Sequence, residues 1–508
     1  MRRSNIEVIR SVFKDIADSV TPTMGARGRL AVIQDEFSRP ILTDDGVTVA
    51  KEMLHLDDPF ERMVAKSMIE AAHNTEKAAF DGTTLTLLLT HELYELGLRW
   101  IEEGLHPQEA ADKLVELLKG VRLKLGEQRI PLTKDMVYDL ANITTKIPLV
   151  AELLREAYDY SKGSMRVIVE HDRVGTDHVV NHIDGMVIDA GYMSESLKQL
   201  CNEEDKSSFK DAHLVLLAEG MVTNAELNAF FDSIPDDRIK SPYVFFVPKS
   251  FNPESLKLIL DTLVENKMRF QIVFINDSRP EEVFLDLAAF TGGRIQDSSQ
   301  GTTKYLFSDC GVASKIVIEQ DKTTIIPKEV DKDEVNKRVA SYQKELTNKK
   351  YNTSIIREHQ LNERLGNLTS GVTKISIAVP TITEFLTLKL KLDDGIGAIR
   401  CAIEDGVVIG AGKALFNIAD RFDEVEKVLK APYYKILDNA GLVPSKKVQK
   451  YNRIGTNVKT KEEADLLKMG IIDSFKSIDT ALENSLSIAS SYLRAYILII
   501  KDKKEQGQ

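Results

Sequence analysis

The sequence has few cysteines, no long apolar run and no excess of basic residues. Its three cysteines (Cys201, Cys310 and Cys401) form no CxxC pair, so neither a disulfide framework nor a structural zinc site is expected. No apolar stretch approaches the ~20 residues that cross a bilayer, and the N-terminal segment lacks the apolar core of a signal peptide. Lys and Arg number 67 against 78 Asp and Glu, a balance poorly suited to sequence-independent nucleic-acid binding. We therefore expect a cytoplasmic protein without membrane or nucleic-acid partners.

The composition is that of a folded protein with several domains. Hydrophobic residues make up 43% and charged residues 29% of the 508 positions, a length that indicates about three domains. Apolar periodicity predicts a helix near the N-terminus, over residues 6–20, and further helices over 59–79, 84–104 and 107–126. Between the first two of these, a hairpin is expected that turns at Arg39-Pro40 and Asp45-Gly46. A mixed segment follows, and short apolar runs then alternate with helices between 185 and 365, which predicts an α/β domain with a largely parallel sheet.

The two ends of the chain resemble each other in class. The segment from 393 to about 500 is again predicted to be helical, so the termini are expected to build one domain into which the middle of the chain is inserted. The charged stretch 331–365 is predicted to form two helices whose charges face solvent.

Three short segments carry residues suited to phosphate and metal chemistry. Thr23–Arg29 contains two glycines that let backbone amides approach an anion. Asp81-Gly82-Thr83-Thr84 precedes a helix whose N-terminus is a natural anion site, although an N-capping turn is an equally good local interpretation. The third segment joins Asp393-Asp394 to Gly406–Gly412, and Asp45 is a further candidate carboxylate. Neither a GxxxxGK[ST] phosphate loop nor the HRD and DFG signatures of kinases are present.

The order of these motifs resembles the group I chaperonins, the bacterial GroEL type, along nearly the whole chain. The matching segments are Thr23–Arg29, Ile41–Ala50, Asp81–Thr84, Asp184–Met186, Gly191-Tyr192, Thr291–Gly293, Asp321–Ile326, Asp394, Glu404–Gly412 and Met469–Asp473. Each motif alone is modest, but the ordered series is specific.

The resemblance implies a multidomain α and α/β fold with three domains. These are a helical equatorial ATP-binding domain (1–126 and 393–508), a small α+β intermediate hinge domain (127–184 and 366–392) and an α/β apical substrate-binding domain (185–365). It also implies an ATPase that drives protein folding, with ATP and Mg²⁺ as cofactors and K⁺ as a further candidate.

The resemblance also assigns roles to individual positions. Asp394 and Asp45 would be catalytic, with Asp394 orienting the attacking water, and Asp81 would bind Mg²⁺. The nucleotide would be surrounded by Thr23, Met24, Gly25, Ala26, Asp81, Gly82, Thr83, Thr84, Leu85, Ile143, Gly410, Ala411, Gly412, Asn457, Ile472 and Asp473.

The expected partners are unfolded or misfolded client proteins and further copies of this chain in a seven-membered ring. Clients would bind apolar apical residues, for which the candidates are Tyr192, Leu197, Phe230, Phe231, Ile234, Leu256, Ile259 and Leu260. The same residues could instead pack beneath the apical sheet. Whether a co-chaperonin lid is needed is left open.

Several family positions are altered. Phe80 replaces a glycine, Ala26 a proline, Leu85 a threonine and Asp44 a lysine. At the ring–ring contact, Tyr434 and Val443 replace an Arg and a Glu, and Lys446 replaces a small apolar residue, so a single ring is expected. Such divergence is typical of a fast-evolving member, for example a virus-encoded one in its host's cytoplasm. The alternatives are a passive holdase with a weak or vestigial ATPase and, less favoured, a group II chaperonin with a built-in lid.

Overall fold

The computed structural model divides the chain into two compact units. The helical unit comprises Met1–Asp159 and Val379–Gln508, and the α/β unit comprises Tyr160–Ala378. Both ends of the chain thus belong to the same unit, as the predicted nested layout requires, whereas the finer division into three domains stays a prediction. The structure describes residues 5–495 except for 35–39, 44–45, 53, 55, 162, 164, 173–174, 193–206, 219–223, 266–267, 297–304, 320–321, 348–354, 370, 446–447 and 449–451.

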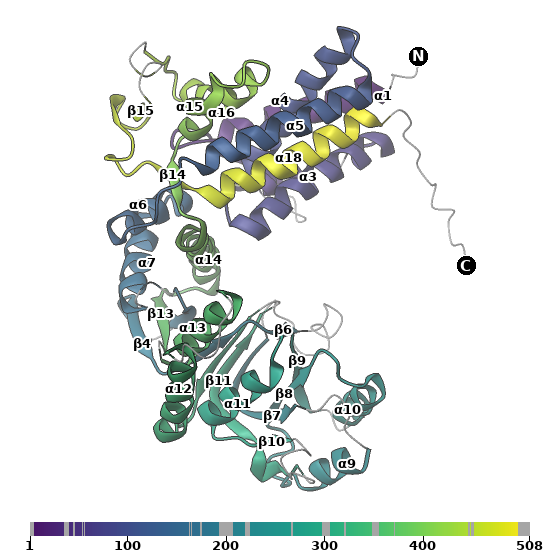
Figure 1. Cartoon of the computed structure of the whole chain (residues 1–508), viewed down its shortest axis with the longest axis vertical. Helices are drawn as coiled ribbons and strands as arrows, with labels where there is room; N and C mark the ends of the chain where they lie inside the picture. The colour runs from purple at the N-terminus through teal and green to yellow at the C-terminus, as the bar shows by residue number, and fades with distance from the viewer. Residues whose placement is uncertain are drawn as a thin grey trace, which may run out of the picture. The chain divides into compact units, whose positions relative to one another are not determined.

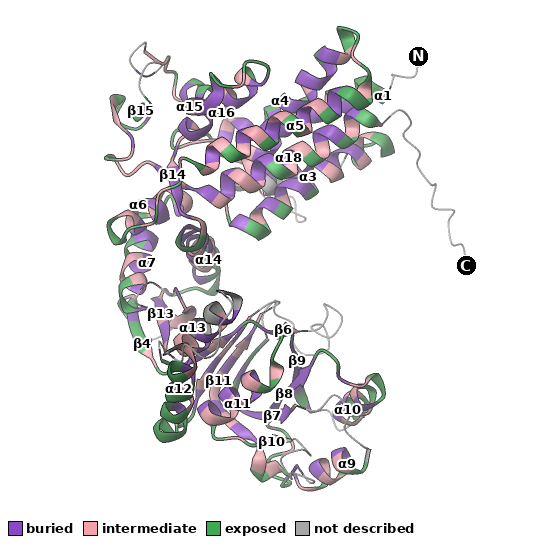
Figure 2. Ribbon diagram, in the orientation of Figure 1, coloured by how far each residue is buried: buried purple, intermediate pink, exposed green. Residues whose placement is uncertain are grey.

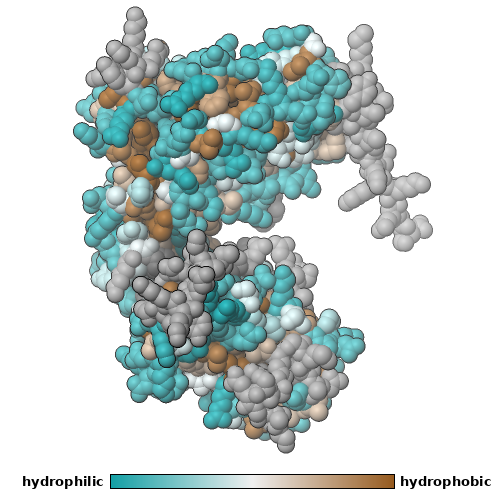
Figure 3. All heavy atoms as spheres, in the orientation of Figure 1, coloured by the Kyte–Doolittle hydropathy of each residue, from teal (hydrophilic) through white to brown (hydrophobic). Residues whose placement is uncertain are grey.

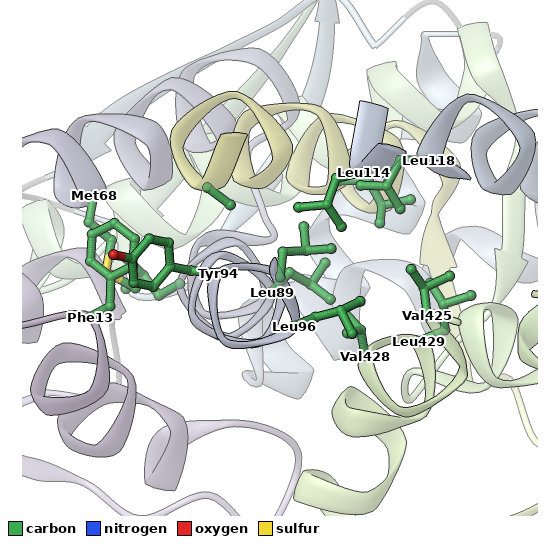
Figure 4. Close-up of a cluster of buried hydrophobic side chains, with 14 of the residues drawn as sticks. Phe13, Met68, Leu89, Tyr94, Leu96, Leu114, Leu118, Val425, Val428 and Leu429 are labelled. Atoms are coloured by element: carbon green, nitrogen blue, oxygen red, sulfur yellow. The ribbon is translucent and has the colours of Figure 1, made fainter. Parts of the chain in front are cut away.

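Long helices build the core of the helical unit (Figure 1). They are α1 (Asn5–Val20), α3 (Pro59–Ala79), α4 (Thr83–Glu102), α5 (Pro107–Gly126) and α18 (Phe475–Arg494). Their apolar stripes face inward (Figure 2), and Figure 4 shows side chains from α1, α3, α4, α5 and α16 meeting in one cluster. The rings of Phe13 and Tyr94 pack edge to face there, with centroids 5.0 Å apart. On the face seen in Figure 3, hydrophilic side chains dominate this unit and hydrophobic ones form separate patches.

Local signals explain why α3 has the predicted limits. Asp58 caps its N-terminus by accepting a hydrogen bond from the backbone N–H of Phe60, and Pro59 occupies the first helical position, where no N–H is needed. The helix ends at Phe80, whose backbone is left-handed. Since the next helix, α4, begins only three residues later, at Thr83, the turn Phe80–Gly82 is fixed on both sides.

Shorter elements complete the helical unit. The helices are η1 (Thr21–Thr23), α2 (Gly46–Glu52), α6 (Lys134–Thr145), α7 (Pro148–Tyr160), α14 (Ile382–Asp405), α15 (Lys413–Ala419) and α16 (Glu426–Asn439). Three antiparallel pairs join β1 (Ala31–Gln34) to β2 (Pro40–Thr43), β14 (Val407–Ile409) to β17 (Ile472–Ser474), and β15 (Ile454–Asn457) to β16 (Glu462–Asp465).

Two predictions for this unit need correction. The expected hairpin has its first pair of strands, but the chain after Asp45 forms helix α2 rather than another strand. The C-terminal region is not purely helical, because it contributes β14–β17, and its first helix starts at Ile382 instead of near 393. Val47, Thr48 and Val49 favour strands locally, yet Val49 and Ala50 are buried in the helical core, so tertiary packing decides.

The α/β unit contains two sheets. In the smaller one, β13 (Val372–Ala378) lies between β3 (Val167–Asp172) and β4 (Val179–Ile183). The larger has eight strands in the order β5-β12-β11-β7-β8-β9-β6, with β10 pairing with β7. Its strands are β5 (Met186–Ile188), β6 (Gly191–Tyr192), β7 (Ser207–Leu217), β8 (Pro242–Pro248), β9 (Arg269–Ile275), β10 (Ile295–Gln296), β11 (Gly311–Ile318) and β12 (Thr323–Pro327).

The larger sheet is mixed, so the prediction of a largely parallel sheet is wrong. Strands β7, β8, β9 and β10 pair in parallel, whereas β5, β6, β11 and β12 are joined by antiparallel pairs. The associated helices are α9 (Asn224–Asp232), α10 (Pro253–Glu265), α11 (Pro280–Thr291), η4 (Phe307–Asp309), α12 (Lys332–Thr347) and α13 (Ile355–Thr369). Crossover helices follow β7 and β8, which explains the parallel centre.

Helices α12 and α13 do not carry only solvent-facing charges. Arg357 and Arg364 are 7% and 6% exposed and form ion pairs with Asp277, Glu282 and Glu345. The expectation of a solvated charged face is therefore wrong for these two arginines, whose burial is made possible by carboxylates on neighbouring elements.

Candidate functional site

The turn between α3 and α4 presents a carboxylate beside a helix N-terminus. Gly82 has a φ of +92°, a left-handed backbone that glycine adopts without strain, and it directly precedes α4. Its N–H donates to Oδ1 of Asp81 at 2.6 Å. The opening residues Thr83–Leu85 are partly buried, and the amides of a first helical turn have no intrahelical partner. This turn can therefore bind an anion next to a carboxylate.

The first glycine loop is held by its backbone. Asn439 donates from Nδ2 to the carbonyl oxygens of Thr21 and Met24, at 2.9 Å each. The Thr23 hydroxyl is buried and donates to the carbonyl of Val20 at 2.8 Å. Because the Met24 N–H also donates to the carbonyl of Thr21, the loop can offer a phosphate the backbone amides of Gly25 and Ala26, which is the contact expected of a glycine-containing loop.

A second carboxylate lies close to Asp81. Asp473 is on β17, and its carboxylate accepts a hydrogen bond from the backbone of Ala411. Burial, and next the negative charge of Asp81, raise the pKa of Asp473 to about 7. The Gly410–Gly412 turn packs tightly there, since a Cβ on Gly410 would lie 3.0 Å from Oδ1 of Asp473. The carboxylates of Asp81 and Asp473 therefore lie close to each other, with few positively charged groups near them.

Helix α14 brings a lysine and a third carboxylate to this turn. Burial raises the pKa of Asp81, while the charges of Lys146 and Lys391 act in the opposite direction. Lys391 also lies 3.8 Å from Asp394, measured between Nζ and Oδ2. Lys391 is thus near enough to Asp81 for its charge to act there, and Asp394 lies one helical turn further along the same helix.

The start of α2, which follows Asp45 in the chain, approaches the same turn. Asp45 lies outside the described residues. Its neighbour Gly46 is buried, and a Cβ there would lie 2.5 Å from Oγ1 of Thr84 and 3.3 Å from Oγ1 of Thr83. The start of α2 is therefore in contact with the hydroxyls of the α4 N-terminus.

The candidates for the base and ribose contacts lie on β17, on α6 and at the end of β15. Ile472 is fully buried and touches Gly410. Helix α6, which carries Ile143, contacts β17. Asn457 uses its Oδ1 to accept from the backbone of Lys459, and Val458 beside it belongs to the cluster against which Met24 and Ala411 pack. The Thr23–Ala26 loop, the Gly410–Gly412 turn and the region of β15 therefore pack against the same hydrophobic cluster.

The candidate client-binding residues that the structure describes are buried or partly buried. Phe230, Ile234 and Ile259 are buried in the core of the α/β unit, so the expectation that they present an apolar surface is wrong in this structure. Three more (Phe231, Leu256 and Leu260) are partly buried against the same core, Tyr192 is partly buried against a second cluster, and Leu197 lies outside the described residues. Helices α9 and α10 are amphipathic, and their apolar faces pack on the sheet, which is the alternative that the sequence left open.

Sequence reasoning missed Lys146 and Lys391 and gave Phe80 no role. Lys146, at the C-cap of α6, and Lys391, on α14, act on Asp81, and Phe80 packs against Gly397 of α14. For Lys391 a signal existed, because it precedes Asp394 by three positions and so shares its helix face. The other two depend on contacts between segments far apart in the chain.

Comparison with known proteins identifies the family. The profile of the TCP-1/cpn60 chaperonin family matches residues 16–230. "Chaperonin GroEL 1" of Prochlorococcus marinus strain MIT 9313 is 31% identical, over 96% of this chain and 89% of that protein. The chain belongs to the chaperonin family. A protein of the same name from a second strain of Prochlorococcus marinus, strain SARG, is 30% identical over the same shares.

The fold agrees with this assignment. The chaperonin gp146 from bacteriophage EL 2 (Pseudomonas aeruginosa), crystallised in the presence of ATP-BeFx, matches with a TM-score of 0.75 over 98% of both chains, at 18% identity. A second crystal form of gp146 gives a TM-score of 0.67. This chaperonin therefore has the expected multidomain α and α/β fold. None of its described helices combines the length and hydropathy needed to cross a membrane.

The site of this chaperonin is chemically suited to a magnesium nucleotide. Its side chains supply carboxylate and hydroxyl oxygens, the donors that Mg²⁺ prefers. Among the described residues no group of three or more His, Cys, Asp or Glu could enclose a metal ion. A single carboxylate such as Asp81 fits an ion that is held mainly by phosphates and water.

Proposed function

We propose that this chaperonin hydrolyses ATP and uses the hydrolysis to fold other proteins. The proposal is supported by one observation: Asp81 is close enough to Asp473 and to Lys391 for their charges to interact, and Lys391 forms an ion pair with Asp394. Raised pKa values at two neighbouring carboxylates are typical of a site that awaits a cationic partner. Magnesium bound with the nucleotide would supply that positive charge.

The residues divide the work of phosphoryl transfer in a simple way. The N-terminus of α4 and the Thr23–Ala26 amides bind and orient the phosphates, and Asp81 holds the metal. Asp394, aided by Asp45, orients the attacking water, and Asp473 accepts from the ribose hydroxyls. Because this reaction depends on positioning and charge stabilisation, no further acid–base pair is needed.

The two adjacent aspartates of α14 offer a matched test. Asp394→Asn keeps the shape of the side chain but weakens its hold on the water, so phosphate release should fall by about 100-fold or more. Asp393→Asn is the control, since Asp393 bonds Lys389 on another face of α14, and it should change turnover less than two-fold. Binding of a Mg–ATP analogue should be unchanged in both. Full turnover in Asp394→Asn would refute the site, and a wild-type protein that suppresses client aggregation without releasing phosphate would be the passive holdase.

We further propose that the oligomer is a single seven-membered ring that binds clients on the α/β unit. Tyr434 and Val443 are 39% and 88% exposed, and neither can form the ion pairs of the family's ring–ring contact. Lys446 lies outside the described residues. A stable particle of fourteen copies by native mass measurement, with and without ATP, would contradict the single ring.

A further inference from the structure

Phe80 has a backbone conformation that its side chain disfavours. Its φ and ψ are 59° and 12°, the left-handed region in which a bulky residue is an outlier. Its N–H still donates to the carbonyl of Glu76 at 2.7 Å and closes α3. Such strain persists only where surrounding contacts over-determine it, so the ring of Phe80 must have a partner that holds it.

That partner is Gly397 of α14. A Cβ built on Gly397 would lie 2.0 Å from Cγ of Phe80, so the ring rests on the bare backbone of the helix. Any larger residue at 397 would force the ring or the helix to move. Close packing of an aromatic ring on a glycine therefore fixes the distance between the Phe80–Asp81 turn and α14.

The contact lies on the helix face that carries Asp394. Residues 391, 394, 397 and 401 are spaced by three or four positions and form one stripe. Lys391 acts on Asp81, Gly397 meets Phe80, and Sγ of Cys401 contacts the carbonyl of Ala78 at 3.7 Å. Asp394 therefore lies between Lys391, whose charge acts on Asp81, and the contacts of Gly397 and Cys401 with the end of α3.

We infer that Phe80 is a positioning residue, which seats α14 so that Asp394 is held over the Asp81 turn. The inference rests on the proposed function of Asp394. Phe80 itself has no group that can act on a phosphate or on water. Its effect is on geometry, and a displacement of about 1 Å at a catalytic group can cost about 100-fold in rate.

The test uses variants that remove the ring without adding backbone strain. Phe80→Gly suits a positive φ and should lower kcat by roughly ten-fold, while the Kd for a Mg–ATP analogue changes less than two-fold. Phe80→Leu keeps an apolar group over Gly397 and should recover at least half of the rate. Phe60→Gly is the control, because Phe60 lies at the other end of α3 and is equally exposed, at 37% against 38%. Wild-type kcat in Phe80→Gly would overturn the inference, as would equal losses of kcat and binding.

A double-mutant cycle tests the specific contact. Gly397→Ala should lower kcat about as much as Phe80→Gly, because the new methyl group displaces the ring. The double variant should lose no more than either single variant, since the methyl group occupies space that the ring has left. Additive losses would show that the two residues act separately and would overturn the inference.

Amide hydrogen exchange separates this inference from the proposed function. Without nucleotide, amides of residues 394–401 should exchange at least five-fold faster in Phe80→Gly than in the wild type or Phe60→Gly. Unchanged exchange would overturn the positioning role whatever the turnover. Unchanged turnover in Asp394→Asn would overturn the proposed function whatever the exchange.

Discussion

The two units of this chaperonin bury charge in opposite ways. In the α/β unit, Asp286 is 4% exposed and accepts from the Tyr342 hydroxyl at 2.8 Å and from Nε of Arg338 at 2.9 Å. Arg364 adds an ion pair at 3.3 Å. In the helical unit, burial raises the pKa of Asp81 and of Asp473, the charge of Asp81 adds to the rise at Asp473, and both carboxylates accept hydrogen bonds from backbone N–H groups.

This difference separates architecture from function. Burial acts against the charge of Glu282, yet hydrogen bonds from Arg357 leave its pKa below the usual value, as expected of a network that satisfies itself. Burial raises the pKa of Asp81 and Asp473 in the helical unit and also that of Asp286 in the α/β unit. The difference is that Asp286 accepts hydrogen bonds from Arg338 and Tyr342 side chains, whereas Asp81 and Asp473 accept from backbone N–H groups. A network of paired charges stabilises a fold, whereas neighbouring carboxylates that no cationic side chain hydrogen-bonds are typical of a site where a ligand supplies positive charge.

Breaking the satisfied network should have the largest effect on stability. Arg364→Met leaves Asp277, Glu282 and Asp286 without one of their cations, and removing one partner of a buried ion pair costs about 3–5 kcal/mol. Urea unfolding, followed by amide exchange in β8 and β9, should show this loss in the α/β unit. Lys337→Met is the control, because its pair with Glu334 is exposed and should contribute less than ~1 kcal/mol. Equal small effects would mean that burial adds nothing to the network.

A buried lysine gives the helical unit a pH-dependent stability. Lys413 is 1% exposed, its Nζ donates to the carbonyl of Val448 at 2.8 Å, and it lies over the rings of Phe416 and Tyr433. Burial lowers its pKa to about 8, with Asp420 opposing and Lys430 reinforcing the shift. The unfolded chain therefore binds more protons between pH 8 and about 10.5, and stability should rise across that range by up to ~3 kcal/mol.

Lys413→Met removes the titrating group and should remove this rise. The measurement is the difference in unfolding free energy between wild type and variant at pH 7 and pH 10. Lys427→Met is the control, because Lys427 is exposed and nearby, and it should keep the wild-type slope. A slope that survives in Lys413→Met would assign the titration to another group.

The sequence predicted what local chemistry determines. Helices 59–79 and 107–126 were found at their true limits because periodicity, prolines and capping residues agree there. The Asp81–Thr84 turn could be recognised because Asp-Gly before a helix is itself a structural signal. The antiparallel strands at the edges of the large sheet could not be recognised from the sequence, since strand direction depends on pairing between distant segments.

The same limit applies to side chains. Periodicity shows that Phe230 and Ile259 lie on apolar helix faces but does not show whether a sheet or a client covers them. The burial of Arg357 and Arg364 required acids from other elements, and the seating of Phe80 on Gly397 joins positions more than 300 residues apart in the chain. The order of motifs was therefore enough to identify the family. The contacts that are specific to this chain could be seen only in the folded structure.

Replacing one aspartate by asparagine in each unit should give effects of opposite sign. Asp473→Asn retains an oxygen for the Ala411 N–H but removes repulsion with Asp81, so the nucleotide-free protein should become more stable by about 1 kcal/mol, a discounted value because this carboxylate is partly exposed. Because the pKa of Asp473 is higher in the folded than in the unfolded protein, its carboxylate destabilises the fold only when the pH exceeds the pKa of the unfolded state. The stability gained by Asp473→Asn should therefore grow from pH 4 to 7 and then level off. Asp286→Asn should be destabilising at pH 7, because Arg338 loses its anionic partner and Arg364 loses one of its partners. Nucleotide should raise the thermal midpoint less in Asp473→Asn than in the wild type.

If both variants changed stability in the same direction, the two units would not differ in how they use buried charge, and the raised pKa of Asp473 would no longer mark a ligand site.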